Sequence, residues 1–256
     1  IKIDIDRYRV KEGDTINLKK FATYCDQDVD KSAVKNYAFP QALDEISLLQ
    51  AKLFAQSTYG LIIVLQAMDA AGKDSTIKHV FSHLDPNGVH VVSFKQPTEE
   101  EKDHDYMWRI NKALPRRGDI GVFNRSHYED VIVSRVHNLI EQGKMPKNLI
   151  SKDIWDIRYR QIRDWETYLN ENGFPILKIF LHVSKDEQRD RLAAWQPPVS
   201  GQTIMNTFGI PPCHTVGVIK DAIREAILDG VIPNEYGPAY DFMIEKGREL
   251  GLAAKE

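Results

Sequence analysis

The chain has 256 residues, of which 42% are hydrophobic and 28% charged, with a formal net charge of −3. This composition is typical of a soluble globular protein with one large domain, or with one domain and an appendage. The net charge argues against a surface that coats nucleic acid, and no apolar stretch approaches the ~20 residues of a membrane span. The first residues do not resemble a signal peptide. Cys25 and Cys213 match no metal spacing and indicate no disulfide framework, which favours a cytoplasmic location.

Predicted strands and helices alternate along the chain. An amphipathic helix over residues 38–58 leads into a buried apolar strand over 61–65, and a helix starts near Asp74. Later segments are read as strands over 90–94, 119–124 and 175–183, and as helices over 99–114, 128–142, 153–170, 216–228 and 235–250. This alternation predicts an α/β fold with a doubly wound, mostly parallel sheet, whose ligand lies at the carboxyl ends of the strands.

The first strand leads into a candidate phosphate-binding loop. Residues 67–74 read AMDAAGKD, with the spacing of the G-x-x-x-x-G-K-[ST] motif. Gly72 lets backbone amides curl around an oxyanion at the positive end of the following helix, and Lys73 supplies an ammonium group. Ala67 replaces the first glycine of the motif, and Asp74 replaces its magnesium-binding Ser or Thr. The alternative is an ordinary strand-loop-helix corner, but the strand before the loop and the helix after it favour the phosphate loop.

A second polar segment, GVFNRSHYED over residues 121–130, follows another buried strand. Arg125 is a candidate phosphate clamp, and Glu129 and Asp130 are candidates to hold magnesium, although one of these carboxylates is explained by helix initiation alone. Basic residues are concentrated after the phosphate loop, which suits a polyanionic ligand, and solvated helix faces are the alternative for about half of them. These basic residues are Lys95, Arg109, Lys112, Arg116, Arg117, Arg125 and Arg135.

Together these segments resemble the family-2 polyphosphate kinases, in particular the branch that phosphorylates both nucleoside mono- and diphosphates. The resemblance spans about residues 15–191 and rests on QAMDAAGKDSTIKHVFSHLDPNGVHVVSFKQPT, HDYMWRI and ALPRRGDIGVFNRSHYEDVIVSRVHNL. It implies a P-loop NTPase-like (thymidylate-kinase-like) fold, with an N-terminal arm over 1–37 and a kinase core over 38–194. It also implies phosphoryl transfer from inorganic polyphosphate to AMP or ADP, or to GMP or GDP, with Mg²⁺ or alternatively Mn²⁺, in a homo-dimer or tetramer.

The same resemblance implies roles for individual residues. Asp69 would bind magnesium or orient the accepting phosphate oxygen, and Lys73 with the loop amides would hold the transferring phosphates. Asn124 stands where other branches carry Asp, so it would be a weaker metal ligand assisted by Glu129. Arg125 would contact polyphosphate or nucleotide phosphate, whereas Asp119 is a weaker candidate that the strand entry also explains. The other predicted phosphate- or nucleotide-binding residues are Ala70, Ala71, Gly72, Asp74, Ser75, Lys95, Arg109, Arg116, Arg117, Arg135 and Arg189.

Residues 195–256 depart from that family, which normally continues through an Arg-rich lid and further closing helices. Only Lys185, Arg189 and Arg191 remain from the beginning of the lid. The stretch over about 195–252 resembles the C-terminal helices of tRNA nucleotidyltransferases instead. It is predicted to be a helical appendage without RNA-binding function, since it has few basic residues and lacks the catalytic carboxylates of that group.

Two other functions stay open at this point. The same loop chemistry serves an ATP-dependent nucleoside or nucleotide monophosphate kinase, although the basic run over 109–117 favours a polymeric donor. The altered C-terminal quarter also allows a non-catalytic module that binds polyphosphate or nucleotide. The presence of Asp69 with Lys73 argues against that module, since binding alone does not need a carboxylate among phosphates.

Overall fold

The computed structural model describes residues 3–11, 13–25, 27–68, 70–194, 196–228 and 231–254. It divides into two compact units, one formed by Ile1–Phe94 with Thr98–Ser184 and the other by Lys95–Pro97 with Lys185–Glu256. The segment predicted as one core over 38–194 therefore ends in the second unit. None of the described helices is both long and apolar enough to cross a lipid bilayer.

The first unit is built on a four-stranded sheet in the order β2-β3-β1-β4, and all three strand pairs are parallel. Parallel neighbours need crossover connections, which the intervening helices supply. The strands are β1 (Leu61–Ala67), β2 (Val89–Ser93), β3 (Ile120–Asn124) and β4 (Ile176–Leu181). The helices are α1 (Lys31–Ala33), α2 (Phe39–Gln56), α3 (Lys73–Phe81), α4 (Glu99–Lys102), α5 (Trp108–Lys112), α6 (Glu129–Val136), α7 (Leu139–Gln142) and α8 (Ile154–Glu171).

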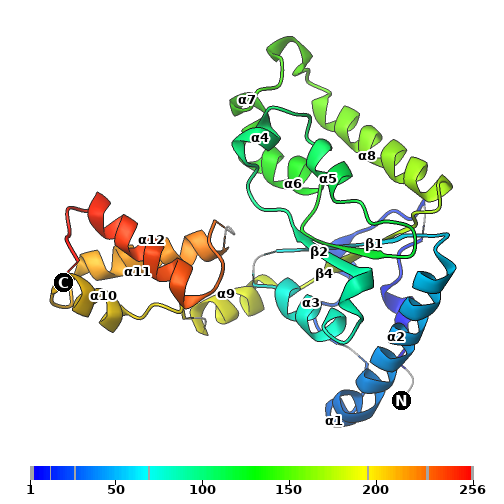
Figure 1. Cartoon of the computed structure of the whole chain (residues 1–256), viewed down its shortest axis with the longest axis horizontal. Helices are drawn as coiled ribbons and strands as arrows, with labels where there is room; N and C mark the ends of the chain where they lie inside the picture. Colours follow the sequence, from blue (N-terminus) through cyan, green and yellow to red (C-terminus); the bar gives the residue numbers. More distant parts are fainter. Residues whose placement is uncertain are drawn as a thin grey trace. The chain divides into compact units, whose positions relative to one another are not determined.

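Helices cover both faces of this sheet, as Figure 1 shows. Successive side chains of β1 alternate between the two faces, so Ile62 and Val64 join a core with residues of α5 and α8. Ile63 and Leu65 join a separate core, against which residues of α2 and α3 pack. The unbroken apolar run of β1 is thus explained by burial on both faces, and the predicted doubly wound α/β fold is confirmed.

Two of the predicted helices are each divided in two. The helix predicted over 99–114 is interrupted after α4, where the Met107 N–H donates to Asp105 Oδ1 over 2.9 Å and forms a turn before α5. The helix predicted over 128–142 is interrupted at Asn138, whose φ of +51° belongs to the left-handed region. Asp and Asn make such local bonds and tolerate such angles. These features interrupt a helix but leave the spacing of apolar residues in the sequence unchanged.

β4 forms an outer edge of the sheet, since among the described residues it pairs with β1 alone. Leu177 and Phe180 on this strand are 50% and 46% exposed. β4 therefore has one edge that is paired to β1, the strand that leads into the phosphate loop, and one edge that is open.

The second unit has a hydrophobic core of its own. It contains α9 (Lys185–Ala194), α10 (Gly201–Phe208), α11 (His214–Leu228) and α12 (Tyr236–Glu249), which agrees with the predicted helical appendage. Helix α12 lies close to α10, because a Cβ added at Gly247 would meet Phe208 Cζ at 2.1 Å. The buried core consists of Val199, Ile204, Phe208, Ile219, Ile223, Ala239 and Met243.

Candidate active site

The loop after β1 has the backbone shape of an anion-binding loop. Gly72 precedes α3 with a φ of +96°, and Ala70 also has a positive φ, of +56°. Gly72, the N-cap of α3, has no side chain, and the positive end of this nine-residue helix lies directly behind it, where an anionic ligand is favoured. Asp69, predicted to be catalytic and to bind metal, lies outside the described residues.

Lys73 begins α3 and reaches back across the loop. Its Nζ donates to the backbone carbonyl of Ala67 over 3.1 Å, so the ammonium group lies at the base of the loop. Of the other predicted loop residues, Ala71 is buried, whereas the side chains of Asp74 and Ser75 are exposed. The backbone and Lys73 therefore provide the positive potential of this loop, and Asp74 adds a negative charge.

The loop after β3 lies at the same edge of the sheet. The register pairs Leu65 with Asn124, and the Arg125 N–H donates to the Leu65 carbonyl over 3.1 Å. Arg125 has a φ of +63°, an uncommon angle for a residue other than glycine. Such backbone strain concentrates at functional sites, and here it occurs on both loops that leave the carboxyl ends of β1 and β3.

Two side chains predicted as metal ligands have polar partners at this edge. The Asn124 Nδ2 donates to Asp74 Oδ1 over 2.6 Å, and Glu129 Oε1 accepts a hydrogen bond of 2.6 Å from Gln66 Nε2. No group of three or more His, Cys, Asp or Glu within the described part of the chain could hold a metal ion by itself. Mg²⁺ commonly binds through one or two protein oxygens together with water and substrate phosphates, and that mode fits Asn124 and Glu129.

Sequence reasoning missed Gln66, the polar residue that ends the otherwise apolar run of β1. It also missed a partly buried polar network behind the second loop. The Tyr128 hydroxyl donates to Glu166 Oε1 over 2.8 Å, and Lys178 Nζ donates to Glu166 Oε2 over 2.6 Å. His127 is fully buried, with Nε2 3.6 Å from Glu166 Oε1. A lysine inside an apolar strand was the available signal for this network.

The charges of this network shift the titration of its members. Burial alone would raise the pKa of Glu166, but the nearby His127 imidazole and the hydrogen bonds from Lys178 and Tyr128 outweigh it and lower the pKa to about 2. Burial, together with the neighbouring Glu166 carboxylate, raises the pKa of the Tyr128 hydroxyl. Glu166 is therefore an ionised anchor for the segment that carries Arg125 and Glu129.

Arg109 is buried near the same carboxyl edge. Its Nη2 lies 3.6 Å from Asp130 Oδ2, and its guanidinium lies over the ring of Phe94, 5.6 Å from the centroid. Burial raises the pKa of Asp130, and the charges of Arg109 and Arg158 oppose that rise. The structure therefore places Arg109 beside the site, in an ion pair with a carboxylate.

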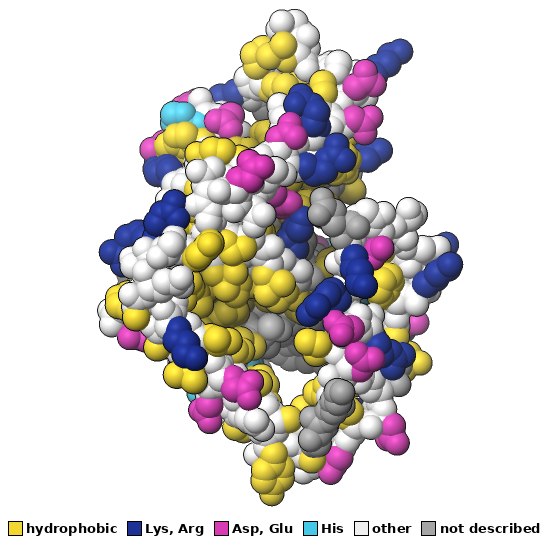
Figure 2. Space-filling view, turned by 90° about the vertical axis from the view of Figure 1, so that its right-hand side faces the viewer, with side chains coloured by type: hydrophobic (Ala, Val, Ile, Leu, Met, Phe, Trp, Pro, Cys, Tyr) yellow, Lys and Arg dark blue, Asp and Glu magenta, His cyan; other side chains and the backbone are white. Residues whose placement is uncertain are grey.

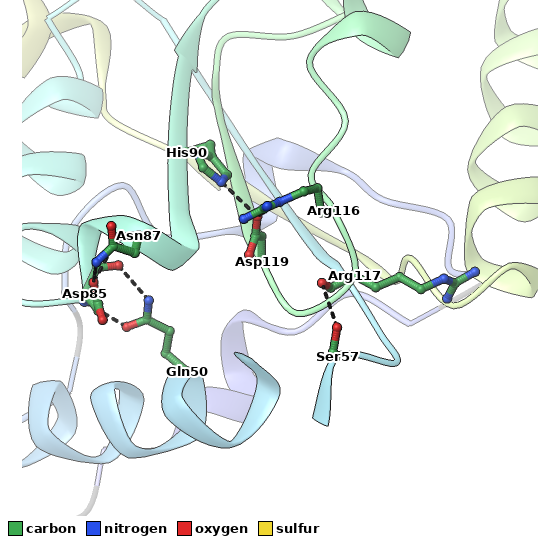
Figure 3. A network of polar contacts seen from close by, with 8 residues as sticks. All are labelled: Gln50, Ser57, Asp85, Asn87, His90, Arg116, Arg117 and Asp119. Atoms are coloured by element: carbon green, nitrogen blue, oxygen red, sulfur yellow. Dashed lines mark hydrogen bonds and ion pairs between the residues drawn. The ribbon is translucent and has the colours of Figure 1, made fainter. Parts of the chain in front are cut away.

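Arg116 and Arg117 are placed at the opposite, amino edge of the sheet (Figure 3). Arg116 Nε and His90 Nε2 both bond to Asp119 Oδ2, over 3.0 and 2.9 Å. Burial would raise the pKa of Asp119, but these two hydrogen bonds lower it overall. The Arg117 guanidinium extends away from Asp119 and donates to two backbone carbonyls, those of residues 58 and 172. The structure therefore does not bring this arginine pair together with the phosphate loop.

The predicted basic residues Arg135, Lys95 and Arg189 belong to two different units of the chain. Arg135 is exposed in the last turn of α6, and Lys95 and Arg189 belong to the second unit, where Arg189 pairs with Asp186 over 3.2 Å. On the face drawn in Figure 2, Lys and Arg side chains stand singly or in small groups among Asp and Glu. The coloured side chains of that face thus form no continuous basic patch.

Comparison with known proteins decides the family. The family model for polyphosphate kinase 2 (PPK2) matches residues 26–199. The chain belongs to the polyphosphate kinase 2 family. It is 43% identical over 196 residues to an ADP-polyphosphate phosphotransferase of Rhodopseudomonas palustris, covering 76% of this chain and 68% of that protein. It is also 43% identical to an AMP/ADP-polyphosphate phosphotransferase of Meiothermus ruber, covering 73% of this chain and 66% of that protein.

A solved structure supports the same assignment. The crystal structure of polyphosphate kinase 2 from Arthrobacter aurescens TC1 matches with a TM-score of 0.65 and 32% identity, over 93% of this chain and 76% of that chain. The predicted P-loop NTPase-like fold is thereby confirmed. The PPK2 match includes both loops of the candidate site and ends at residue 199, close to where the sequence departs from the family.

Proposed function

We propose that this chain transfers a terminal phosphoryl group from inorganic polyphosphate to the phosphate of AMP or ADP. The observation that carries the proposal is the N-terminus of α3 directly behind Gly72, with Lys73 at the base of the loop, inside the segment matched by the PPK2 family. Phosphoryl transfer needs positioning and charge neutralisation more than covalent catalysis, and this arrangement supplies both.

The residues of the two loops have complementary tasks in this proposal. The first amides of α3 and the Lys73 ammonium bind the oxygens of the transferring phosphate. Arg125 clamps a second phosphate with its guanidinium fork. Mg²⁺, when bound, neutralises phosphate charge, and Asn124 and Glu129, together with Asp69, would hold it. The accepting phosphate oxygen is already ionised at neutral pH, so no base is needed.

Two finer points belong to the same proposal. The chain acts on mono- and diphosphates alike, which is supported by its 43% identity to the AMP/ADP-polyphosphate phosphotransferase. It works as a homo-dimer or tetramer, which light scattering of the purified chain would test.

The test is formation of ATP from AMP, and separately from ADP, with long-chain polyphosphate and Mg²⁺. Product from both acceptors is expected, and Lys73→Met should lower the rate by roughly 10²- to 10³-fold, because one preorganised cation is removed. Lys78→Met, on the exposed face of the same helix, is the matched control and should keep the rate within about twofold.

Two outcomes would contradict the proposal. ATP as sole donor supporting transfer to a monophosphate, with polyphosphate inactive, would identify an ATP-dependent nucleotide kinase. Polyphosphate binding without turnover would identify a non-catalytic binding module.

A further inference from the structure

One side-chain amide joins three elements at the carboxyl edge of the sheet. Asn124 Nδ2 donates to Asp74 Oδ1 over 2.6 Å and to Ser93 Oγ over 3.2 Å. Asn124 is the last residue of β3, Ser93 is the last residue of β2, and Asp74 is the second residue of α3. The helix behind the phosphate loop is therefore connected to two strand ends through this amide.

The hydrogen-bonding capacity of the two groups fixes how the amide lies. An ionised carboxylate only accepts hydrogen bonds, so the NH₂ end of Asn124 must face Asp74. Both hydrogens of Nδ2 are then used, one toward Asp74 and one toward Ser93. Oδ1 is the only polar atom of the Asn124 side chain left for a ligand. Because Asp74 is charged, its bond to the amide is stronger than one between neutral groups.

The charge of Asp74 conflicts with the role predicted from its place in the loop. An ionised carboxylate has no proton to donate to a phosphate oxygen, and the two anions repel each other. Its partner in the structure is an amide rather than a cation. A role as a direct phosphate ligand therefore has no support from these contacts.

We propose that Asp74 is a positioning residue that turns the Asn124 amide, so that Oδ1 is presented at the site and α3 is held in register with β3. The pair works as one carboxylate and one amide. Two carboxylates at this distance repel each other and share a proton, whereas two amides form only the weaker neutral bond. The catalytic part of this inference depends on the proposed function, whereas the pairing itself does not.

The experiment is a double-mutant cycle with Asp74→Asn, Asn124→Asp and the exchanged pair D74N/N124D. Asn124→Asp should lower kcat by at least about tenfold at neutral pH, and Asp74→Asn should lower it by a smaller factor. The exchanged pair restores one donor and one acceptor, so its kcat should return to within about threefold of the parent chain. The control is Asn138→Asp, since Asn138 also donates to a carboxylate, Glu141 Oε2, over 2.8 Å but in an exposed pair at the start of α7. That control should leave kcat unchanged.

Two further readouts separate positioning from stability. The kcat of Asn124→Asp should acquire an added dependence on pH, because its two adjacent carboxylates share a proton, and the exchanged pair should lose that dependence. The thermal midpoint of each variant without nucleotide or Mg²⁺ should show the same non-additivity as kcat. Recovery of the midpoint without recovery of kcat would reduce the pair to a structural contact and overturn the positioning role.

Strictly additive effects in both measurements would overturn the pairing itself. If the parent chain forms no ATP from polyphosphate, the proposed function fails instead. The ligand-free midpoints then still decide whether Asp74 and Asn124 act as a pair.

Discussion

Arg109 Nη2 lies 3.6 Å from Asp130 Oδ2, in an ion pair whose side chains are only 8% and 16% exposed. Asp130 Oδ2 makes no hydrogen bond to any described residue, so the charge of the arginine is the main compensation for this buried oxygen. An arginine predicted to bind polyphosphate is thus a member of the buried framework beside the site. A charged residue in such a position stabilises the fold mainly because its removal would leave the charge of its partner buried without compensation.

The first prediction concerns this pair. Arg109→Ala should lower the free energy of unfolding by about 2–4 kcal/mol, because it leaves the Asp130 carboxylate buried without its closest cation. The double variant R109A/D130N should recover part of the loss, since it removes the charge as well. Urea denaturation measures both. Arg160→Ala, from an ion pair whose side chains are 59% and 65% exposed, is the control and should change the stability by less than about 0.5 kcal/mol. Lost turnover at unchanged stability would instead support the predicted role of Arg109 in phosphate binding.

The second prediction concerns Arg117 at the amino edge. Arg117→Ala removes hydrogen bonds to the carbonyls of Thr58 and Asn172 and a contact with the Phe174 ring. The free energy of unfolding should fall by about 1–3 kcal/mol, while the KM for polyphosphate stays within about twofold. Steady-state kinetics with varied polyphosphate measures the latter. A rise of tenfold or more in this KM, in a fully folded variant, would contradict this prediction and support the phosphate-binding role of Arg117 predicted from the sequence.

The third prediction is an acid dependence of stability that comes from Glu166. Its pKa is lowered from 4.5 to about 2 in the folded chain, so the unfolded chain takes up a proton first as the pH falls. The stabilisation by Glu166 is therefore complete above pH 4.5 and is lost between pH 4.5 and about 2. Over that window the parent chain should lose roughly 1–3 kcal/mol more than Glu166→Gln.

Denaturant titrations at several pH values provide the measurement. Asp164→Asn, which removes an exposed carboxylate from the same helix, is the matched control and should keep the acid dependence of the parent chain. Equal acid dependence in the parent chain and Glu166→Gln would contradict the lowered pKa.

The fourth prediction addresses the second unit. Gly247→Ala should lower its stability by about 1–3 kcal/mol, since the new methyl group would lie 2.1 Å from Phe208 Cζ in a filled core. Gly237→Ala in the same helix has no atom within 4 Å and should be neutral or stabilising by a few tenths of a kcal/mol. Thermal unfolding of both variants makes the comparison. Equal midpoints would mean that α10 and α12 pack less closely than described.

The sequence was sufficient to predict the sheet and both loops at its carboxyl edge. The apolar run of β1 predicts a strand that is buried on both faces, and the Gly72–Lys73 pair predicts the change from strand to helix. These features are local, so they are visible in a short window of residues. The division of the helix predicted over 99–114 was missed because local bonds, such as that from the Met107 N–H to Asp105 Oδ1, do not alter the hydrophobic period of the sequence.

The positions of the arginine side chains relative to the sheet could not be predicted from the sequence, for a different reason. Arg109, Arg116 and Arg117 lie within nine residues of each other in the chain, yet the first lies near the carboxyl edge and the other two near the amino edge. The position of each guanidinium depends on the carboxylate or carbonyl that it contacts, which lies in a distant segment or at the end of a strand. Clustering in the sequence therefore indicates positive charge but does not say at which end of a strand that charge lies.

β4 has a neighbour on one side only, within the part of the chain described, and its outer peptide groups face away from the sheet. An open edge of this kind accepts an additional strand through backbone hydrogen bonds alone, without requiring a particular sequence. The phosphate loop leaves β1 and the second loop leaves β3, so growth of the sheet beyond β4 would leave both of them unchanged. The sheet can thus be extended at the open edge of β4, which is separate from the carboxyl ends of β1 and β3, where the two loops of the candidate site begin.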